Sequence, residues 1–112
     1  VFIPSHRFAS AALELVQILE TSDVPAGVIN IVSGNKQELA EQLAGHAETD
    51  AMWCWANHKI ISSVESLSAR DLKRLWVNND SDRDWNDPSQ GEGLEFLRNA
   101  TEIKNIWTPY GD

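Results

Sequence analysis

The stretch that decides the fold is DVPAGVINIVSGNKQEL, residues 23–39. It contains a loop, a β-branched apolar run bounded by glycine on both sides, a glycine turn at Gly34 and a helix start. We therefore expect residues 28–32 to form a central, fully buried strand. Asn35, with Glu38 three residues later, is typical of a helix N-cap with a reciprocal acceptor. A strand-turn-helix unit of this kind can begin a phosphate-binding site.

Strands and helices alternate on both sides of this stretch. Residues 1–3 look like a strand, and RFASAALELVQILETS has the apolar spacing of one helix face. DAMWCWA and LKRLWV are expected to be strands, separated by a helix whose inner face would carry Ile60, Ile61, Val64 and Leu67. The alternation up to Val77 predicts an α/β fold, a parallel sheet with right-handed crossovers and helices on both faces.

The composition changes after Val77. Residues 78–96 are polar and rich in turn formers, which predicts a linker, and LEFLRNA has room for one or two helical turns. TEIKNIWTPY is strand-like. We therefore divide the chain into an α/β segment at residues 1–77, a polar linker at residues 78–96 and a C-terminal β arm at residues 97–112.

Charge and composition exclude several classes of protein. The 112 residues include 17 acidic and 9 basic ones, and the net charge of −8 disfavours nucleic acid. No apolar run approaches the roughly 18 residues of a membrane span, and nothing resembles a signal peptide. Cys54 is the only cysteine, which favours a reducing, cytoplasmic setting. Because residues 1–3 are already strand-like, we expect the sequence to be an excerpt from a longer chain.

The order VPAGVINIVSG and then LAGHAETDAMWCWA resembles the coenzyme-binding half of an aldehyde dehydrogenase. The resemblance runs from the first helix to DLKRLWV, and EGLEFLRNATEIKNIWTP is similar to the family's C-terminal arm. The variant it resembles most is aldehyde dehydrogenase family 16, whose chains carry a second, degenerate dehydrogenase module at the C-terminus. The resemblance implies a Rossmann-like parallel sheet with helices on both faces and an oligomerisation-type β arm.

The resemblance also implies where coenzyme would bind, and this chain differs at most of those positions. Ile3 and His6 stand where the family has a lysine and a nearby glutamate at the adenine ribose. Of the family's glycine-rich turn only Gly34 remains, with Lys36 and Ala40 at the other glycine positions. The coenzyme site implied by the resemblance is therefore degenerate at its phosphate-binding turn.

The catalytic positions of the family are also changed. Ala56 and Asn57 replace a Gly-Ser pair that faces coenzyme, and Asn78 replaces the general-base glutamate. The domain that carries the family's nucleophilic cysteine is absent. We expect no catalytic residue, and a weak, degenerate coenzyme-binding set of Gly34, Trp55 and Asn57.

Each chemical candidate has a plain structural alternative. Gly34 could admit a pyrophosphate to a helix N-terminus, or simply permit a tight turn. Cys54 could be a nucleophile, but a buried, inert thiol is the better interpretation of its place within a strand. The three histidines lack a metal-binding spacing, so no metal site is expected. The aspartates of DSDRDWND lack the glycine of a calcium loop, which favours a solvated loop anchored by Trp85.

The tryptophans leave two interpretations open. Trp53 and Trp55 share one strand face, Trp76 lies on the next strand and Trp107 on the arm. Core packing and an interaction surface are both compatible with this pattern.

Two functions follow. One is a non-catalytic pseudo-dehydrogenase module that serves structure and assembly. The other is the coenzyme-binding segment of an active NAD-dependent aldehyde oxidoreductase whose catalytic residues lie elsewhere in the parent chain. The first needs no cofactor in this segment, whereas the parent chain could use NAD. The expected partner is another dehydrogenase module of the same chain or of a homo-oligomer, with neither nucleic acid nor membrane.

The arm is the expected assembly element. As a strand it places Ile103 and Trp107 on one face and Ile106 on the other, so both faces carry apolar surface. Such a strand invites pairing with another chain. The alternative is that the arm folds back as an edge strand of its own domain.

Overall fold

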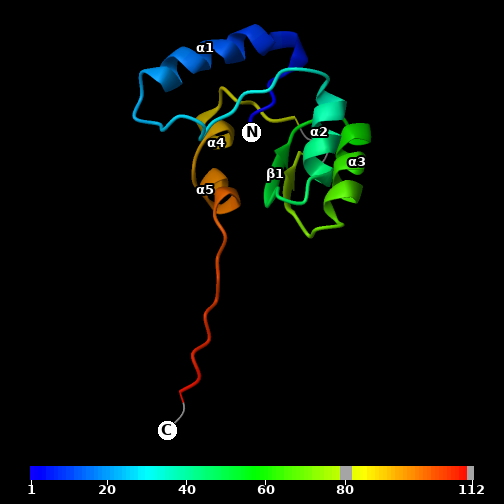
Figure 1. Ribbon diagram of the computed structural model, residues 1–112, viewed down its shortest axis with the longest axis vertical. Helices are drawn as coiled ribbons and strands as arrows, with labels where there is room; N and C mark the ends of the chain where they lie inside the picture. Colours follow the sequence, from blue (N-terminus) through cyan, green and yellow to red (C-terminus); the bar gives the residue numbers. More distant parts are fainter. Residues whose placement is uncertain (79–81, 111–112) are drawn as a thin grey trace. The chain divides into compact units, whose positions relative to one another are not determined.

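The computed structural model describes residues 1–78 and 82–110, which fall into two compact units, Val1–Val77 and Asn78–Asp112. Parts of the predicted linker (residues 79–81) and of the predicted arm (residues 111–112) lie outside the described residues. The first unit contains, in order, η1 (His6–Phe8), α1 (Ala9–Glu20), α2 (Lys36–Gly45), β1 (Ala51–Cys54), α3 (His58–Ser68) and β2 (Arg74–Val77) (Figure 1). The second contains α4 (Pro88–Gly91) and α5 (Leu94–Ala100).

The strands β1 and β2 form a parallel pair joined by α3. Ala51 lies opposite Arg74 and Cys54 opposite Val77, so the register is continuous over both strands. This mixture of helices with a small parallel sheet confirms an α/β fold for the first unit. Parallel strands need a crossover of a dozen or so residues, and α3 with its flanking turns supplies it.

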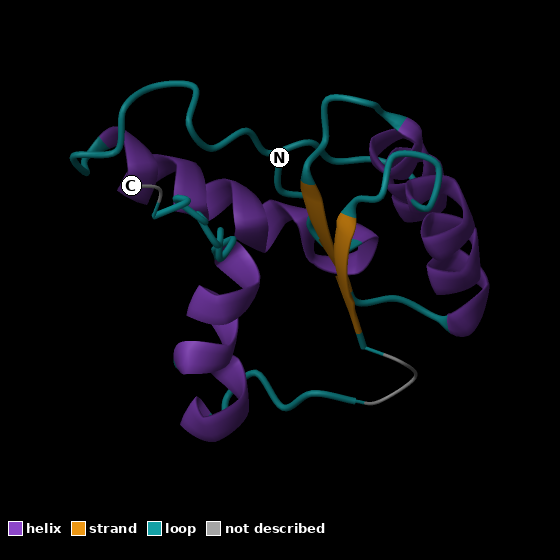
Figure 2. Cartoon of the chain, turned by 90° about the horizontal axis from the view of Figure 1, so that it is seen from below, coloured by secondary structure: helices purple, strands orange, loops and turns teal. Residues whose placement is uncertain are grey.

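The core lies where α2 and α3 pack on one face of this pair. Met52 and Cys54 point to that face from β1 because alternate strand residues share a face. Ala40 and Ala44 of α2 and Val64 of α3 are buried against them. Alanine at two successive turns lets the helix approach closely, and Figure 2 shows both helices beside the strands. The predicted inner face of α3 is confirmed.

The turn before β2 fixes where that strand starts. Lys73 donates its backbone N–H to the carbonyl of Ser68 (3.3 Å), and its buried ammonium pairs with the Asp71 carboxylate at 2.8 Å. The hydrogen bond from that ammonium holds the pKa of Asp71 below its ordinary value. Leu72, between them, has a φ of 54°, a left-handed conformation that non-glycine residues seldom adopt.

The prediction of a buried central strand at residues 28–32 is wrong. Only an isolated parallel bridge, between Phe2 and Ile31, forms there, with a bond from the Phe2 N–H to the Asn30 carbonyl at 2.8 Å. Val28 is 63% exposed. The β-branched run has the propensity of a strand, but burial needs neighbours on both faces, and local sequence does not supply them.

The helix α1 forms as its spacing predicts, but none of its residues is fully buried. Of the predicted face, Ala12, Val16 and Leu19 lie half-buried, whereas Leu15 is exposed. The helix therefore covers its own unit with one side only.

In the second unit, Arg83 organises the stretch predicted as linker. Its guanidinium donates to the carbonyl of Gln90 (2.7 Å) and to both carboxylate oxygens of Glu95 (3.0 and 3.1 Å). It also lies over the rings of Trp85 and Phe96, 5.8 and 5.5 Å from their centroids. A bidentate ion pair with cation–π contacts is the kind of local network that can order a polar segment.

Asp87 caps α4 and accepts hydrogen bonds from the hydroxyl and backbone N–H of Ser89 at 2.8 and 2.9 Å, which lowers the pKa of its carboxyl.

Residues 101–110 form no helix or strand and are exposed throughout. The strand predicted for residues 101–110 is therefore not formed in the described chain.

Substitutions in the core and in the exposed run at residues 28–32 should differ in their effect on the free energy of unfolding. Val64→Ala should lower the free energy of unfolding by about 1–3 kcal/mol, because removing its two fully buried methyl groups leaves a cavity. Val28→Ala, the matched control at an exposed site, should change it by less than about 0.5 kcal/mol. Urea unfolding followed by circular dichroism measures both, and equal losses would mean that residues 28–32 are buried after all.

Gly91→Ala should disrupt the Arg83 network, because a Cβ there would lie 2.6 Å from the Trp85 carbonyl oxygen. We expect faster amide hydrogen exchange over residues 83–96, measured by mass spectrometry. Gly45→Ala is the control, since a Cβ at Gly45 meets nothing within 4 Å. Unchanged exchange in the Gly91 variant would show that the turn tolerates the added carbon.

Candidate functional site

The candidate site is the edge of the first unit where α2 and α3 begin. The ammonium of Lys36, the first residue of α2, donates a hydrogen bond to the backbone carbonyl of Trp55, just after β1. Asn57, two residues on, is the N-cap of α3. In parallel α/β sheets this edge, outside the carboxyl ends of the strands, is where ligands bind.

The N-terminus of α2 is capped from within the chain. The Asn35 side-chain oxygen accepts from the N–H groups of Gln37 (3.0 Å) and Glu38 (3.4 Å), and its amide donates to the Glu38 carboxylate at 3.3 Å. The predicted N-cap with its reciprocal acceptor is confirmed. Two N–H groups that could bind an anion are thus already paired, and Glu38 adds negative charge to the first turn.

The N-terminus of α3 is capped in the same way. The Asn57 side-chain oxygen accepts from the N–H of Ile60 at 3.1 Å. Asn57, one of the three sequence-predicted coenzyme-binding residues, therefore stabilises a helix start. The other two lie nearby, since Trp55 accepts the Lys36 bond and Gly34 immediately precedes the Asn35 cap.

Gly34 permits close packing within the unit. Its φ lies outside the left-handed region, and a Cβ there would lie 3.2 Å from a methyl carbon of Leu39. The glycine therefore lets the turn approach Leu39 on α2.

Cys54 ends β1 inside the core. The thiol is buried, and that burial raises its pKa more than the charge of Lys36 lowers it. The predicted burial of this thiol is confirmed. A thiol held protonated in this way is a poor nucleophile.

Three tryptophans form a cluster along one face of the two strands. Trp76 lies opposite Trp53 in the sheet register, and its ring centroid is 4.9 Å from those of both Trp53 and Trp55. All three pairs are close to perpendicular, the edge-to-face arrangement that aromatic rings prefer. Sequence spacing placed Trp53 and Trp55 on one face, but only the strand register added Trp76. Trp53 is still 38% exposed.

Other candidate groups have structural roles. His46 ends α2, where its backbone N–H donates to Leu43 and its Nδ1 accepts from the Glu48 N–H at 3.2 Å. Within residues 1–78 and 82–110 no three His, Cys, Asp or Glu side chains gather as a metal site would require. No helix in the described part of the chain has the length and apolar character to cross a membrane.

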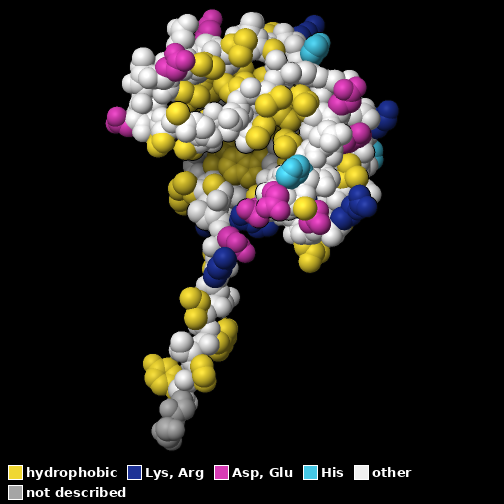
Figure 3. All heavy atoms as spheres, viewed as in Figure 1, with side chains coloured by type: hydrophobic (Ala, Val, Ile, Leu, Met, Phe, Trp, Pro, Cys, Tyr) yellow, Lys and Arg dark blue, Asp and Glu magenta, His cyan; other side chains and the backbone are white. Residues whose placement is uncertain are grey.

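The predicted interface residues of the arm project into solvent. Ile103, Ile106 and Trp107 are almost fully exposed, as is Tyr110. Figure 3 shows these apolar side chains along residues 101–110. They make no contact that would favour one strand face over the other.

Comparison with known proteins identifies the family of this chain. The aldehyde dehydrogenase family matches the chain over residues 1–82. The chain belongs to the aldehyde dehydrogenase family. The match covers the whole first unit, whereas residues 83–112 lie beyond it.

Two bacterial relatives of this aldehyde dehydrogenase-like chain support the assignment. It is 29% identical over 75 residues to "Putative aldehyde dehydrogenase DhaS" of Bacillus subtilis, and 32% identical over 75 residues to "Putative aldehyde dehydrogenase SSP0762" of Staphylococcus saprophyticus. Each alignment covers 67% of this chain, but only 15% and 16% of the relatives. The chain thus spans a small part of the length of the curated relatives it matches. No solved structure gives a significant match.

Proposed function

We propose that this chain is a non-catalytic pseudo-dehydrogenase module that serves structure and assembly in a larger aldehyde dehydrogenase-like protein. In this proposal the first unit is a degenerate Rossmann-like segment, similar to the C-terminal module of aldehyde dehydrogenase family 16. It acts in the cytoplasm, as the single cysteine favours.

The observation that carries the proposal is the hydrogen bond from Lys36 to the Trp55 carbonyl. In a dinucleotide-binding fold the second glycine of the turn leaves space for the pyrophosphate to approach the backbone. Here that position carries Lys36, whose side chain crosses to the turn after β1. A pyrophosphate would have to displace this side chain from its partner.

The two helix caps support the same conclusion. A pyrophosphate binds free N–H groups at a helix N-terminus. Asn35 uses two such groups of α2, and Asn57 uses one of α3. The carboxylate of Glu38 in the first turn of α2 would repel an anion. The residues present therefore fit poorly with NAD.

A second candidate is the coenzyme-binding segment of an active NAD-dependent aldehyde oxidoreductase. Family membership over residues 1–82 favours it, as does the retained β1-α3-β2 crossover. Lys36 could serve either function, since an ammonium at a turn can also bind phosphate. Its substitution therefore separates the two candidates.

Titration calorimetry of the full chain with NAD is the test. We expect no measurable binding, which means a Kd weaker than about 1 mM. Lys36→Ala should also show none, because both helix caps remain. Lys59→Ala, at an exposed lysine in the first turn of α3, is the matched control. Binding by the native chain that Lys36→Ala alone abolishes would reject the pseudo-dehydrogenase and favour the second candidate.

We also propose that the arm, residues 97–112, joins this module to another dehydrogenase module in the same chain or in a homo-oligomer. Ile103, Ile106 and Trp107 supply its apolar surface, and their exposure supports a role in contact with a second sheet. Lys104 and Pro109 limit uncontrolled growth of such a sheet.

Deletion of residues 101–112 should lower the oligomeric state of the parent protein, as measured by size-exclusion chromatography with light scattering. Trp107→Ala should weaken assembly in the same direction, because a buried tryptophan anchor contributes more than its neighbours. Asn105→Ala, a polar position in the same segment, is the control. If the oligomer kept its size after the deletion, the proposal that the arm mediates assembly would be wrong.

A further inference from the structure

The helix α1 carries two apolar stripes. The first is half-buried in its own unit and consists of Ala9, Ala12, Val16 and Leu19. The second consists of Ala11, Leu15 and Ile18 of α1 together with Phe8, the N-cap residue just before the helix, and they follow one another at intervals of three, four and three residues. That interval is typical of the seam along which two helices pack. All four residues of the second stripe are exposed, and Ile18 is 63% exposed.

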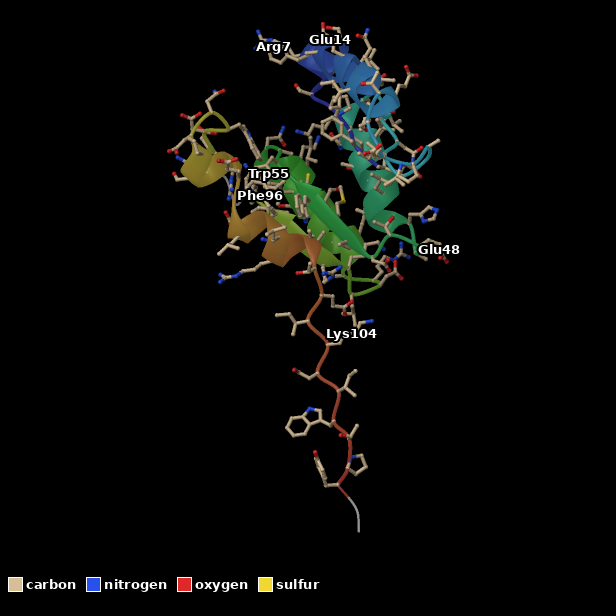
Figure 4. The ribbon with its side chains drawn as sticks, turned by 90° about the vertical axis from the view of Figure 1, so that its left-hand side faces the viewer. Arg7, Glu14, Glu48, Trp55, Phe96 and Lys104 are labelled. Atoms are coloured by element: carbon tan, nitrogen blue, oxygen red, sulfur yellow. The ribbon has the colours of Figure 1, made fainter. Side chains whose placement is uncertain are left out.

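The charges at the ends of α1 oppose the helix dipole. Arg7 lies next to the N-terminus, and Glu20 and Asp23 lie at the C-terminus. The first turn has no acidic residue and the last turn no basic one. A helix by itself is stabilised by the reverse arrangement. Figure 4 shows Arg7 of η1 and Glu14 of α1 projecting away from the rest of the unit.

We propose that the second stripe is a self-association surface on which α1 packs antiparallel to α1 of a second copy of this chain. This arrangement places Phe8 opposite Ile18 of the other copy, and Ala11 opposite Leu15. Large and small side chains then face each other in the two inner layers, which lets the helices approach closely.

Charge complementarity selects the second copy and the antiparallel direction. In this pairing Arg7 lies near Glu20 and Asp23 of the other copy, at both ends of the helix pair. Each helix N-terminus thereby gains the nearby carboxylates that its own sequence lacks, and each C-terminus gains a cation. A parallel pair would instead place Arg7 beside Arg7 and Glu20 beside Glu20, and both contacts are repulsive.

The test is the dimer dissociation constant of the full chain, measured by sedimentation equilibrium. Ile18→Glu should raise it at least about tenfold, because it places a charge against Phe8 of the other copy, in both outer layers of the seam. Leu13→Glu is the matched control on the same helix, because Leu13 is 53% exposed and lies outside both stripes. Equal effects of the two substitutions, or a native chain still monomeric at about 1 mM, would overturn the proposal.

A charge exchange tests the antiparallel direction. Arg7→Glu should weaken the dimer, and adding Glu20→Arg to the same chain should restore it, since each copy then offers the reversed pair. Failure of the double variant to recover would overturn the antiparallel arrangement. Repeating the series without residues 101–112 separates this contact from assembly through the arm, so either surface can fail without the other.

Discussion

The close packing of α2 on α3 is the constraint on which the first unit depends. Ala40 and Ala44 remove side-chain bulk from one side of α2, and Val64 fills the space that remains. Larger residues on α2 would separate the helices and lift them from Met52 and Cys54. Because the helices are held at this distance, their N-termini start side by side at one edge of the unit. The geometry of that edge follows from the core.

At that edge the chain satisfies its own polar groups. Lys36 bonds to the Trp55 carbonyl, and Asn35 and Asn57 pair the helix N–H groups. These internal hydrogen bonds stabilise the two helix starts, and the proposal that this chain does not bind coenzyme depends on them. The family assignment rests on the sequence match over residues 1–82, whereas the proposed loss of coenzyme binding rests on these few contacts.

Apolar surface that the two units leave exposed is the basis of both assembly proposals. Tryptophan and isoleucine side chains of the arm and the second stripe of α1 face solvent in the described chain. A domain this small cannot bury all its large apolar residues, and exposed contiguous ones mark contact surfaces. The segment around Arg83 is different, because it has few apolar side chains to bury. It is ordered instead by the Arg83–Glu95 ion pair and by the contacts of Arg83 with the rings of Trp85 and Phe96.

Sequence by itself determined the elements whose signals are local. The spacing of Ile60, Ile61 and Val64 fixed the inner face of α3, and Asn35 with Glu38 fixed the start of α2, because periodicity and capping act within a few residues. The resemblance of residues 24–56 also pointed to the correct family.

Tertiary structure decided what depends on distant neighbours. The run at residues 28–32 is β-branched, yet it makes one bridge, since a strand is buried only where other elements cover it. Trp76 joined Trp53 and Trp55 through strand register, and Lys36 reached a carbonyl 19 positions away. Neither contact has a signal in the local sequence, because both arise from segments that only the folded core brings together.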